Sequence, residues 1–207
     1  RVIYGSFDKR SKERECDFTM NVYDWDNTIY RQDSTANFVL WLFRNRPKTL
    51  LSIPRTLVYA IGYGLHVVDK LTFKENLYHM FVFVKDMDGT TDAFVDSHMD
   101  HVKEFYLKQQ KEDDVVISAS PEFTIKRFCK KLGIKHVMAT VVDPKTGKHT
   151  GLNCHGEEKV KRFYQMFPNA EIDEFYSDSL SDTPLALKAK RAFLVKGDQI
   201  LDWPKKS

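Results

Sequence analysis

The order of apolar and polar positions divides the chain into two kinds of segment. Residues 18–25 form an apolar run that ends in polar residues, which predicts a strand followed by a loop. Residues 34–110 show apolar positions at helical spacing, with no strand pattern between them. This block is called the helical insert below.

From residue 111 onward, short apolar runs alternate with amphipathic stretches. We expect strands over 115–118, 136–142, 174–177 and 192–195, and helices over 121–132, 157–167 and 181–190. Alternating strands and helices predict an α/β, Rossmann-like parallel sheet with helices on both faces. The expected core domain is therefore 18–33 plus 111–207, interrupted by an all-helical domain over 34–110. Residues 1–17 are predicted to be a tail of unknown role.

Polar side chains that could carry chemistry follow the predicted strands. The first group is Asp24 and Asp26, and two carboxylates so close repel each other unless a cation or a shared proton lies between them. Ser118 stands between a strand and the start of a helix, where free N–H groups suit an anion. Lys159 and the pair Asp178 and Asp182 complete the set.

Each group also has a plain structural explanation. The aspartates could form a polar turn, Ser118 and Asp182 could be helix N-caps, and Lys159 could lie on a solvated helix face. Taken together in this order, at the ends of strands of one sheet, they supply a nucleophile, a phosphate-binding hydroxyl, a cation and metal ligands.

This set of motifs resembles the haloacid dehalogenase superfamily of phosphohydrolases. The resemblance covers Asp24-Trp25-Asp26-Asn27-Thr28, Ser118, Lys159, and Asp178 with Asp182, and it spans the whole expected core. The helical insert after the first motif is similar to the cap of the phosphoserine-phosphatase-like branch. The resemblance implies that the insert closes over the site, excludes water and selects the substrate.

The resemblance also implies roles for single residues. Asp24 would attack phosphorus and become phosphorylated, and Asp26 would protonate the leaving oxygen and later activate water. For this, Asp26 must start protonated, so we expect a raised pKa. Ser118, Ala119, Lys159 and Thr28 are assigned to the phosphate-binding loops.

A magnesium ion is implied by the same resemblance. Its ligands would be Asp24, the backbone carbonyl of Asp26, and Asp178, with Asp182 orienting either the metal ligands or Lys159. The ion would shield the nucleophile from the negative charge of the phosphate.

Composition narrows the range of partners and of cellular environments. The net charge of +3 is too small to predict nucleic-acid binding. The three cysteines are odd in number and widely spaced, and no long apolar stretch opens the chain, so we expect a reducing, cytoplasmic environment. The oligomeric state is left open by the sequence.

The substrate is the least determined property. Phosphoserine, or another small phosphorylated metabolite, is the first expectation for this branch, with Asp33 near the position that would select it. However, Ser118-Ala119-Ser120 replaces the Ser-Gly-Gly usual in serine phosphatases.

A lipid phosphate is the alternative substrate, because the sequence also resembles the phosphatidylglycerophosphatase C type of this branch. Residues 50–68 are apolar and are expected to form a buried helix of the insert; the alternative is an interfacial helix that makes the protein membrane-peripheral. Transfer of the phosphoryl group to an alcohol, and a catalytically silent phosphate-binding relative, also stay open.

Overall fold

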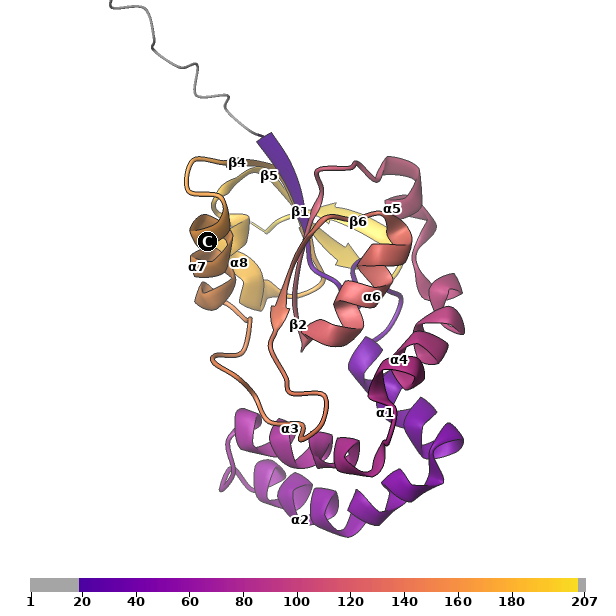
Figure 1. Cartoon of the computed structure of the whole chain (residues 1–207). Helices are drawn as coiled ribbons and strands as arrows, with labels where there is room; N and C mark the ends of the chain where they lie inside the picture. Colours follow the sequence, from indigo (N-terminus) through magenta and orange to yellow (C-terminus); the bar gives the residue numbers. More distant parts are fainter. Residues whose placement is uncertain (1–18, 205–207) are drawn as a thin grey trace, which may run out of the picture.

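The computed structural model describes residues 19–204 of the 207-residue chain. Its centre is one six-stranded sheet in the order β3-β2-β1-β4-β5-β6 (Figure 1). The strands are β1 (Thr19–Tyr23), β2 (Val115–Pro121), β3 (His136–Thr140), β4 (Glu171–Ser177), β5 (Ala189–Lys196) and β6 (Gln199–Asp202). The first five pair in parallel, and β6 adds an antiparallel edge. The predicted tail, residues 1–17, lies outside the described residues.

Helices cover both faces of the sheet, as the alternation of strands and helices predicts. Alternate residues of β1 enter different cores, since successive side chains of a strand point to opposite faces. Met20 and Val22 pack with Phe163 of α7 (Glu157–Met166) and with Leu185 of α8 (Thr183–Ala186). On the other face, Tyr23 belongs to a core that includes side chains of α6 (Glu122–Leu132). The predicted fold class is confirmed.

The chain between β1 and β2 is helical throughout, apart from its connecting loops. Its α-helices are α1 (Ser34–Asn45), α2 (Ile53–Gly64), α3 (Lys70–Tyr78), α4 (Met87–Asp96) and α5 (Glu104–Gln109). Short 3-10 helices lie between them, namely η1 (Pro47–Ser52), η2 (His79–Phe83) and η3 (Met99–His101). A fourth, η4 (Leu180–Asp182), follows β4.

The helical insert is joined to the sheet by a continuous aromatic core. The ring centroids of Phe38 in α1 and Phe94 in α4 lie 4.9 Å apart, and those of Phe94 and Phe128 in α6 lie 5.9 Å apart. Phe128 in turn contacts Trp25, two residues after the end of β1. Thus α1 and α4 are anchored to the sheet layer, while α2 and α3 lie farther out (Figure 1). The boundaries of a separate insert domain, 34–110, stay a prediction.

Two local expectations were wrong. The helix predicted over 181–190 is much shorter, because η4 and α8 end at Ala186 and β5 begins at Ala189. The apolar run 50–68 is not a buried helix: it is split between η1 and α2, and no residue of α2 is buried. A continuous apolar run has the same pattern in a core as on a surface, so periodicity could not separate the two.

No helix within residues 19–204 is both long and apolar enough to cross a bilayer.

Candidate active site

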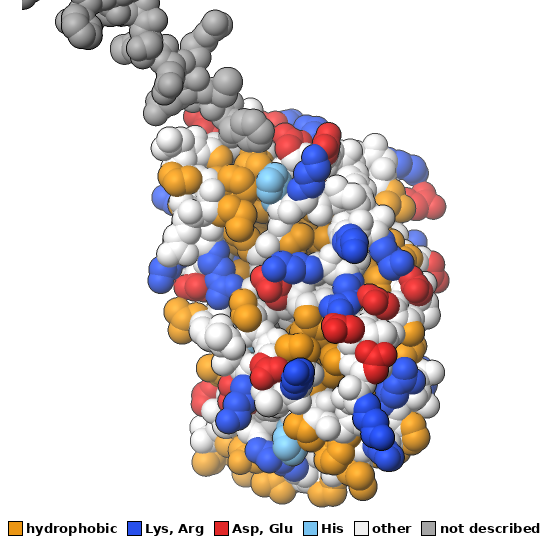
Figure 2. Space-filling model, in the orientation of Figure 1, with side chains coloured by type: hydrophobic (Ala, Val, Ile, Leu, Met, Phe, Trp, Pro, Cys, Tyr) orange, Lys and Arg blue, Asp and Glu red, His pale blue; other side chains and the backbone are white. Residues whose placement is uncertain are grey.

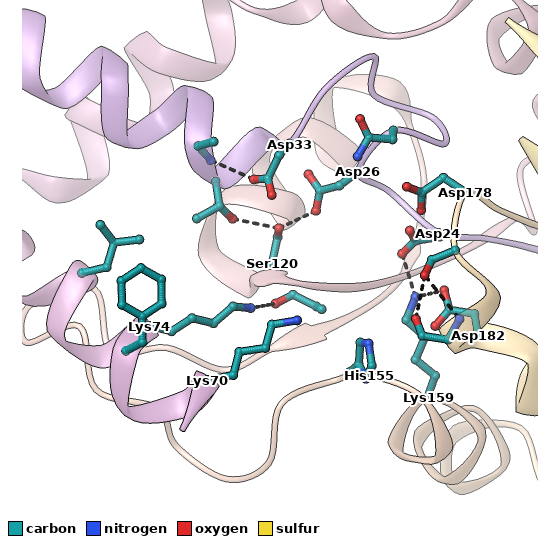
Figure 3. A pocket seen from close by; sticks show the side chains of 18 of the residues that line it. Asp24, Asp26, Asp33, Lys70, Lys74, Ser120, His155, Lys159, Asp178 and Asp182 are labelled. Atoms are coloured by element: carbon teal, nitrogen blue, oxygen red, sulfur yellow. Dashed lines mark hydrogen bonds and ion pairs between the residues drawn. The ribbon is translucent and has the colours of Figure 1, made fainter. Parts of the chain in front are cut away.

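A pocket of about 340 Å³ lies where the carboxyl ends of β1, β2 and β4 meet the inner side of α3. These three strands are neighbours in the sheet, so the loops that follow them converge. Most of the residues singled out from the sequence line this pocket, namely Asp24, Asp26, Asp33, Ala119, Lys159, Asp178 and Asp182 (Figure 3).

Lys159 joins two carboxylates at the bottom of the pocket. Its Nζ lies 2.7 Å from Asp24 Oδ1 and 2.7 Å from Asp182 Oδ2, and all three side chains are buried. Asp182 Oδ2 also accepts a hydrogen bond from Ser177 Oγ at 2.8 Å. Lys159 stands in the first turn of α7, where a cation is disfavoured by the helix dipole, so the carboxylates compensate for its position. Lys159 therefore fixes the orientation of Asp24.

The buried charges perturb one another. Burial raises the pKa of Asp24 to about 7, although Lys159 opposes the shift, and the charges of Asp182 and Asp26 add to it. For Lys159, burial disfavours the charged form, but the two carboxylates outweigh it and the net pKa shift is upward. Lys159 therefore stays positively charged among several carboxylates.

Asp26 is held by hydroxyl groups from two distant segments. Its Oδ1 accepts from Ser34 N at 2.6 Å and from Ser34 Oγ at 2.5 Å, both at the start of α1. Its Oδ2 accepts from the hydroxyl of Ser120, which is itself 2.8 Å from Thr35 Oγ1. Burial, followed by the charge of Asp33, raises the pKa of Asp26, although the serine donors oppose the shift. The expected upward shift is present, and it favours the protonated acid.

Residue Asn27 lets the chain turn sharply behind Asp26. Its φ of 58° is in the left-handed region, which Asn tolerates better than most residues. The turn reverses the chain, because Tyr30 N donates to Trp25 O at 2.9 Å. Asp24 directly before this turn and Asp26 within it both line the pocket.

Two predicted phosphate-binding residues are not brought to the pocket surface. Thr28 is fully buried, and its hydroxyl has no partner within the described part of the chain. Ser118 is also fully buried, and its Oγ accepts from Ser120 N at 3.0 Å. Ser120 and Ala119 line the pocket instead. The phosphate-binding roles of Ser118, Ala119 and Thr28 stay predictions.

Ser120 was not singled out in the sequence, for a reason visible in the sheet. The pairing of β2 with β3 shifts register between Ser118 and Pro121, so alternation along the strand does not hold there. The only signal available was its place close to the start of the predicted helix.

The helical insert supplies two cations that the sequence argument missed. Lys70 and Lys74, one turn apart on α3, both line the pocket (Figure 3). Lys74 Nζ donates to the carbonyl of Ala119 at 3.2 Å, and burial, followed by the charge of Lys70, lowers its pKa. Asp33 lines the same side but also caps α1, since its Oδ1 accepts from Ala36 N at 2.8 Å.

The donor set fits a magnesium ion. Asp24 and Asp178 both line the pocket and lie close together (Figure 3), while the Asp26 carboxylate is engaged by the two serines. Asp182 Oδ1 is buried and has no hydrogen-bond partner among residues 19–204. Burial, followed by the charge of Asp182, raises the pKa of Asp178. This crowding of carboxylates around one lysine favours a bound cation.

Side chains alone do not complete a metal site. Among residues 19–204, no group of three or more His, Cys, Asp or Glu side chains is arranged to hold a metal ion. Two carboxylates with a main-chain oxygen would still suit magnesium, because this ion takes oxygen ligands and usually keeps several waters.

The family of the chain follows from comparison with known proteins. Residues 22–187 match the model of the haloacid dehalogenase-like hydrolase family. This match spans most of the 207 residues, so the chain belongs to that family, and the resemblance to the haloacid dehalogenase superfamily is confirmed.

A curated relative is a probable phosphatase of Mycobacterium tuberculosis. It is 33% identical over 94 residues, which cover 42% of this chain and 33% of the relative. The chain therefore matches only a third of that protein's length.

Solved structures share the fold at low sequence identity. A protein of unknown function from Bordetella pertussis has a TM-score of 0.65 at 18% identity, covering 84% of this chain and 88% of its own. A probable phosphoserine phosphatase from Vibrio cholerae has a TM-score of 0.54 at 11% identity, covering 84% and 55%. At such identities the likeness concerns the fold alone.

Proposed function

We propose that this chain is a magnesium-assisted phosphatase that hydrolyses a phosphomonoester through an aspartyl-phosphate on Asp24. The arrangement that carries the proposal is Asp24 held at 2.7 Å by the buried Lys159, beside an Asp26 whose pKa is raised. The name of the mycobacterial relative, a probable phosphatase, supports the same chemistry.

In the first step, an oxygen of Asp24 attacks phosphorus while the bond from phosphorus to the ester oxygen breaks. The Asp26 carboxyl gives its proton to the departing oxygen, so the alcohol leaves neutral. Lys159 stands beside the attacking carboxylate and can also donate to a phosphoryl oxygen as charge develops there. The product of this step is a phosphoryl group bound to Asp24.

In the second step, the Asp26 carboxylate takes a proton from water, which attacks the phosphorus. The bond from phosphorus to Asp24 breaks, inorganic phosphate leaves, and both aspartates return to their starting states. Magnesium, held by Asp24, Asp178 and the Asp26 carbonyl, would supply Lewis-acid stabilisation of the phosphoryl oxygens.

A small, charged metabolite is the substrate class that the pocket supports first. Lys70 and Lys74 could bind a carboxylate, and Asp33 an ammonium group, which is the combination that phosphoserine carries. The exposed apolar side chains of α2 favour a second candidate, a lipid phosphate such as a phosphatidylglycerophosphate.

The test is phosphate release from p-nitrophenyl phosphate, with and without magnesium, by the full chain and by Asp24→Asn. We expect magnesium-dependent turnover, reduced about a thousandfold or more in the variant, which cannot form the covalent bond. Asp173→Asn is the matched control, since this aspartate of β4 does not line the pocket. Turnover that survives in Asp24→Asn would contradict the mechanism, and no turnover by the parent chain on phosphoserine or lipid phosphates would favour a silent relative.

A further inference from the structure

The outer part of the helical insert exposes an unusual amount of apolar surface. Between residues 50 and 67, nine large hydrophobic side chains are exposed, namely Leu50, Leu51, Ile53, Leu57, Val58, Ile61, Tyr63, Leu65 and Val67. All of them except Tyr63, which also packs against α3, are called the outer apolar face below. Val67 is 80% exposed and Leu65 68%. Contiguous exposure of this kind, unlike scattered apolar residues, indicates a surface that binds something.

The spacing of these residues places most of them on one side. Leu57, Ile61 and Leu65 follow one another at intervals of four, which aligns them along one face of a helix. Leu51 precedes this row by about two turns. The result is a stripe along the length of η1 and α2 rather than a pocket.

The opposite side of α2 packs against α3. Tyr63 stacks on Phe73 of α3 at 5.2 Å, and Arg55 Nε donates to Asn76 Oδ1 at 2.8 Å. Gly62 packs so close to Val68 that an added Cβ would lie 2.8 Å from its Cγ2. The helix is therefore fixed against α3 by one side, and its other side faces away from the rest of the described chain.

The chain segment that carries the outer apolar face has charges of one sign. Residues 34–68 contain four basic residues, Arg44, Arg46, Lys48 and Arg55, and no acidic residue. Asp33 and Asp69 flank this stretch. Their side chains accept hydrogen bonds as the N-caps of α1 and α3, respectively. Figure 2 shows apolar side chains gathered at the lower end of the molecule, where α2 lies in Figure 1, with Lys and Arg beside them.

We propose that the outer apolar face docks on a membrane that contains anionic lipids. An exposed apolar helix face, in a segment whose charged side chains are all basic, is the pattern of a helix that lies in the plane of a bilayer interface. A second copy of the chain fits less well, because a symmetric contact would bring the same basic residues together across the interface.

Docking in this way would leave the pocket close to the bilayer. The outer apolar face belongs to η1 and α2, α2 packs on α3, and α3 carries Lys70 and Lys74 into the pocket. One helix layer thus separates the docking surface from the site. The outer apolar face contributes no side chain to the catalytic pocket. The protein could therefore bind vesicles without being a phosphatase, or be a phosphatase without binding vesicles.

The experiment is sedimentation of the full chain with vesicles of phosphatidylcholine alone, or of phosphatidylcholine with phosphatidylglycerol. We expect binding only to the mixed vesicles, weakened by salt. Leu57→Asp with Val58→Asp should reduce that binding about tenfold or more. The matched control, Leu107→Asp with Leu187→Asp, changes side chains that are 50% and 64% exposed, against 58% and 66% for Leu57 and Val58. It should bind like the parent.

A second pair of variants changes charge without touching the apolar side chains. Arg44→Gln with Lys48→Gln should weaken binding to the mixed vesicles, whereas Lys145→Gln with Lys148→Gln, equal in charge and also exposed, should not. Absence of parent binding to mixed vesicles, equal binding to both vesicle types, or equal losses in test and control pairs would overturn the proposal. A dimer that disappears in Leu57→Asp with Val58→Asp, without vesicle binding, would assign the surface to a second copy instead.

Discussion

Ionisable side chains are usually exposed and apolar side chains usually buried. The pocket departs from the first rule and the outer apolar face from the second. In the pocket, Lys159 and Asp182 are almost fully buried although both are ionisable. On the outer side of the insert, α2 buries no residue although its sequence is apolar. Charges inside and apolar side chains outside both cost stability, so each departure indicates a functional site rather than a requirement of the fold.

The two regions also differ in how their energy is distributed. The stability of the buried ion pairs requires all of their partners, because removing one side chain leaves an opposite charge buried without a counter-charge. Each side chain of the outer apolar face contributes little to the stability of its neighbours, since these side chains are largely surrounded by water in the free protein. Substitutions should therefore have large effects in the pocket and small effects on the outer face.

The largest effect is expected for Lys159→Met. It leaves Asp24 and Asp182 buried without their cation, which should lower the free energy of unfolding by about 3 to 5 kcal/mol. Denaturant unfolding measures this loss. Lys159→Arg keeps the charge and should lose less stability, and adding Asp182→Asn to Lys159→Met should recover part of it. Equal losses for Met and Arg would show that packing, not charge, decides the effect.

The pH dependence of turnover should respond to Asp33. The charge of Asp33 contributes to the raised pKa of Asp26, so Asp33→Asn should lower that pKa. Asp26 is active as an acid below its pKa, so the fall in kcat at high pH should begin at a lower pH in the variant. Asn is also a good N-cap, so α1 should keep its start. A substrate with a poor leaving group is required, and an unchanged basic limb would contradict the assignment of Asp26 as the acid.

Replacing a buried carboxylate away from the pocket, that of Asp114, should have a smaller effect and should raise stability instead of lowering it. Burial raises the pKa of Asp114 from 3.8 to about 6, and its Oδ1 has no partner within the described chain. The folded state therefore holds this proton more tightly than the unfolded state, and stability falls as pH rises from about 4 to about 6.

Asp114→Asn removes this penalty. The variant should be about 1 to 2 kcal/mol more stable than the parent at pH 7, with no gain near pH 4. Urea unfolding at both pH values checks the difference. A gain of equal size at both would mean that the substitution acts through packing instead of charge.

The smallest effect is expected on the outer apolar face. Leu57→Ser should change the free energy of unfolding by about 0.5 kcal/mol or less, because this side chain is already 58% exposed. Phe38→Ala, on the buried side of the same insert, should cost about 3 to 5 kcal/mol. Comparable losses for the two variants would show that the outer apolar face is covered in solution.

Much of the pocket could be predicted because its residues lie at strand ends. The carboxyl ends of parallel strands meet at one edge, so Asp24, Asp178 and Asp182 could be placed together from the sequence alone. The suggestion that Asp182 orients Lys159 agrees with their 2.7 Å contact. Periodicity was sufficient here because the sheet fixes the geometry.

Other features depend on contacts that no local pattern records. Lys70 and Lys74 reach the pocket only because α3 folds back over the strand ends, which is a matter of tertiary packing. Ser120 replaces Ser118 at the pocket surface through a register shift. The exposure of α2 follows from how few elements pack around it, and a run of apolar residues does not reveal this.

The central claim is that Asp24 carries the phosphoryl group, and it can be tested by trapping that group. The Asp26→Asn variant, mixed with p-nitrophenyl phosphate and magnesium and then quenched in acid, should still undergo the first step, since this leaving group needs little protonation. It should be slow in the second step, which needs Asp26 as a base. We predict that mass spectrometry finds one phosphoryl group, on the peptide that contains Asp24. A phosphoryl group on another residue, or none while the parent chain turns over, would contradict the account.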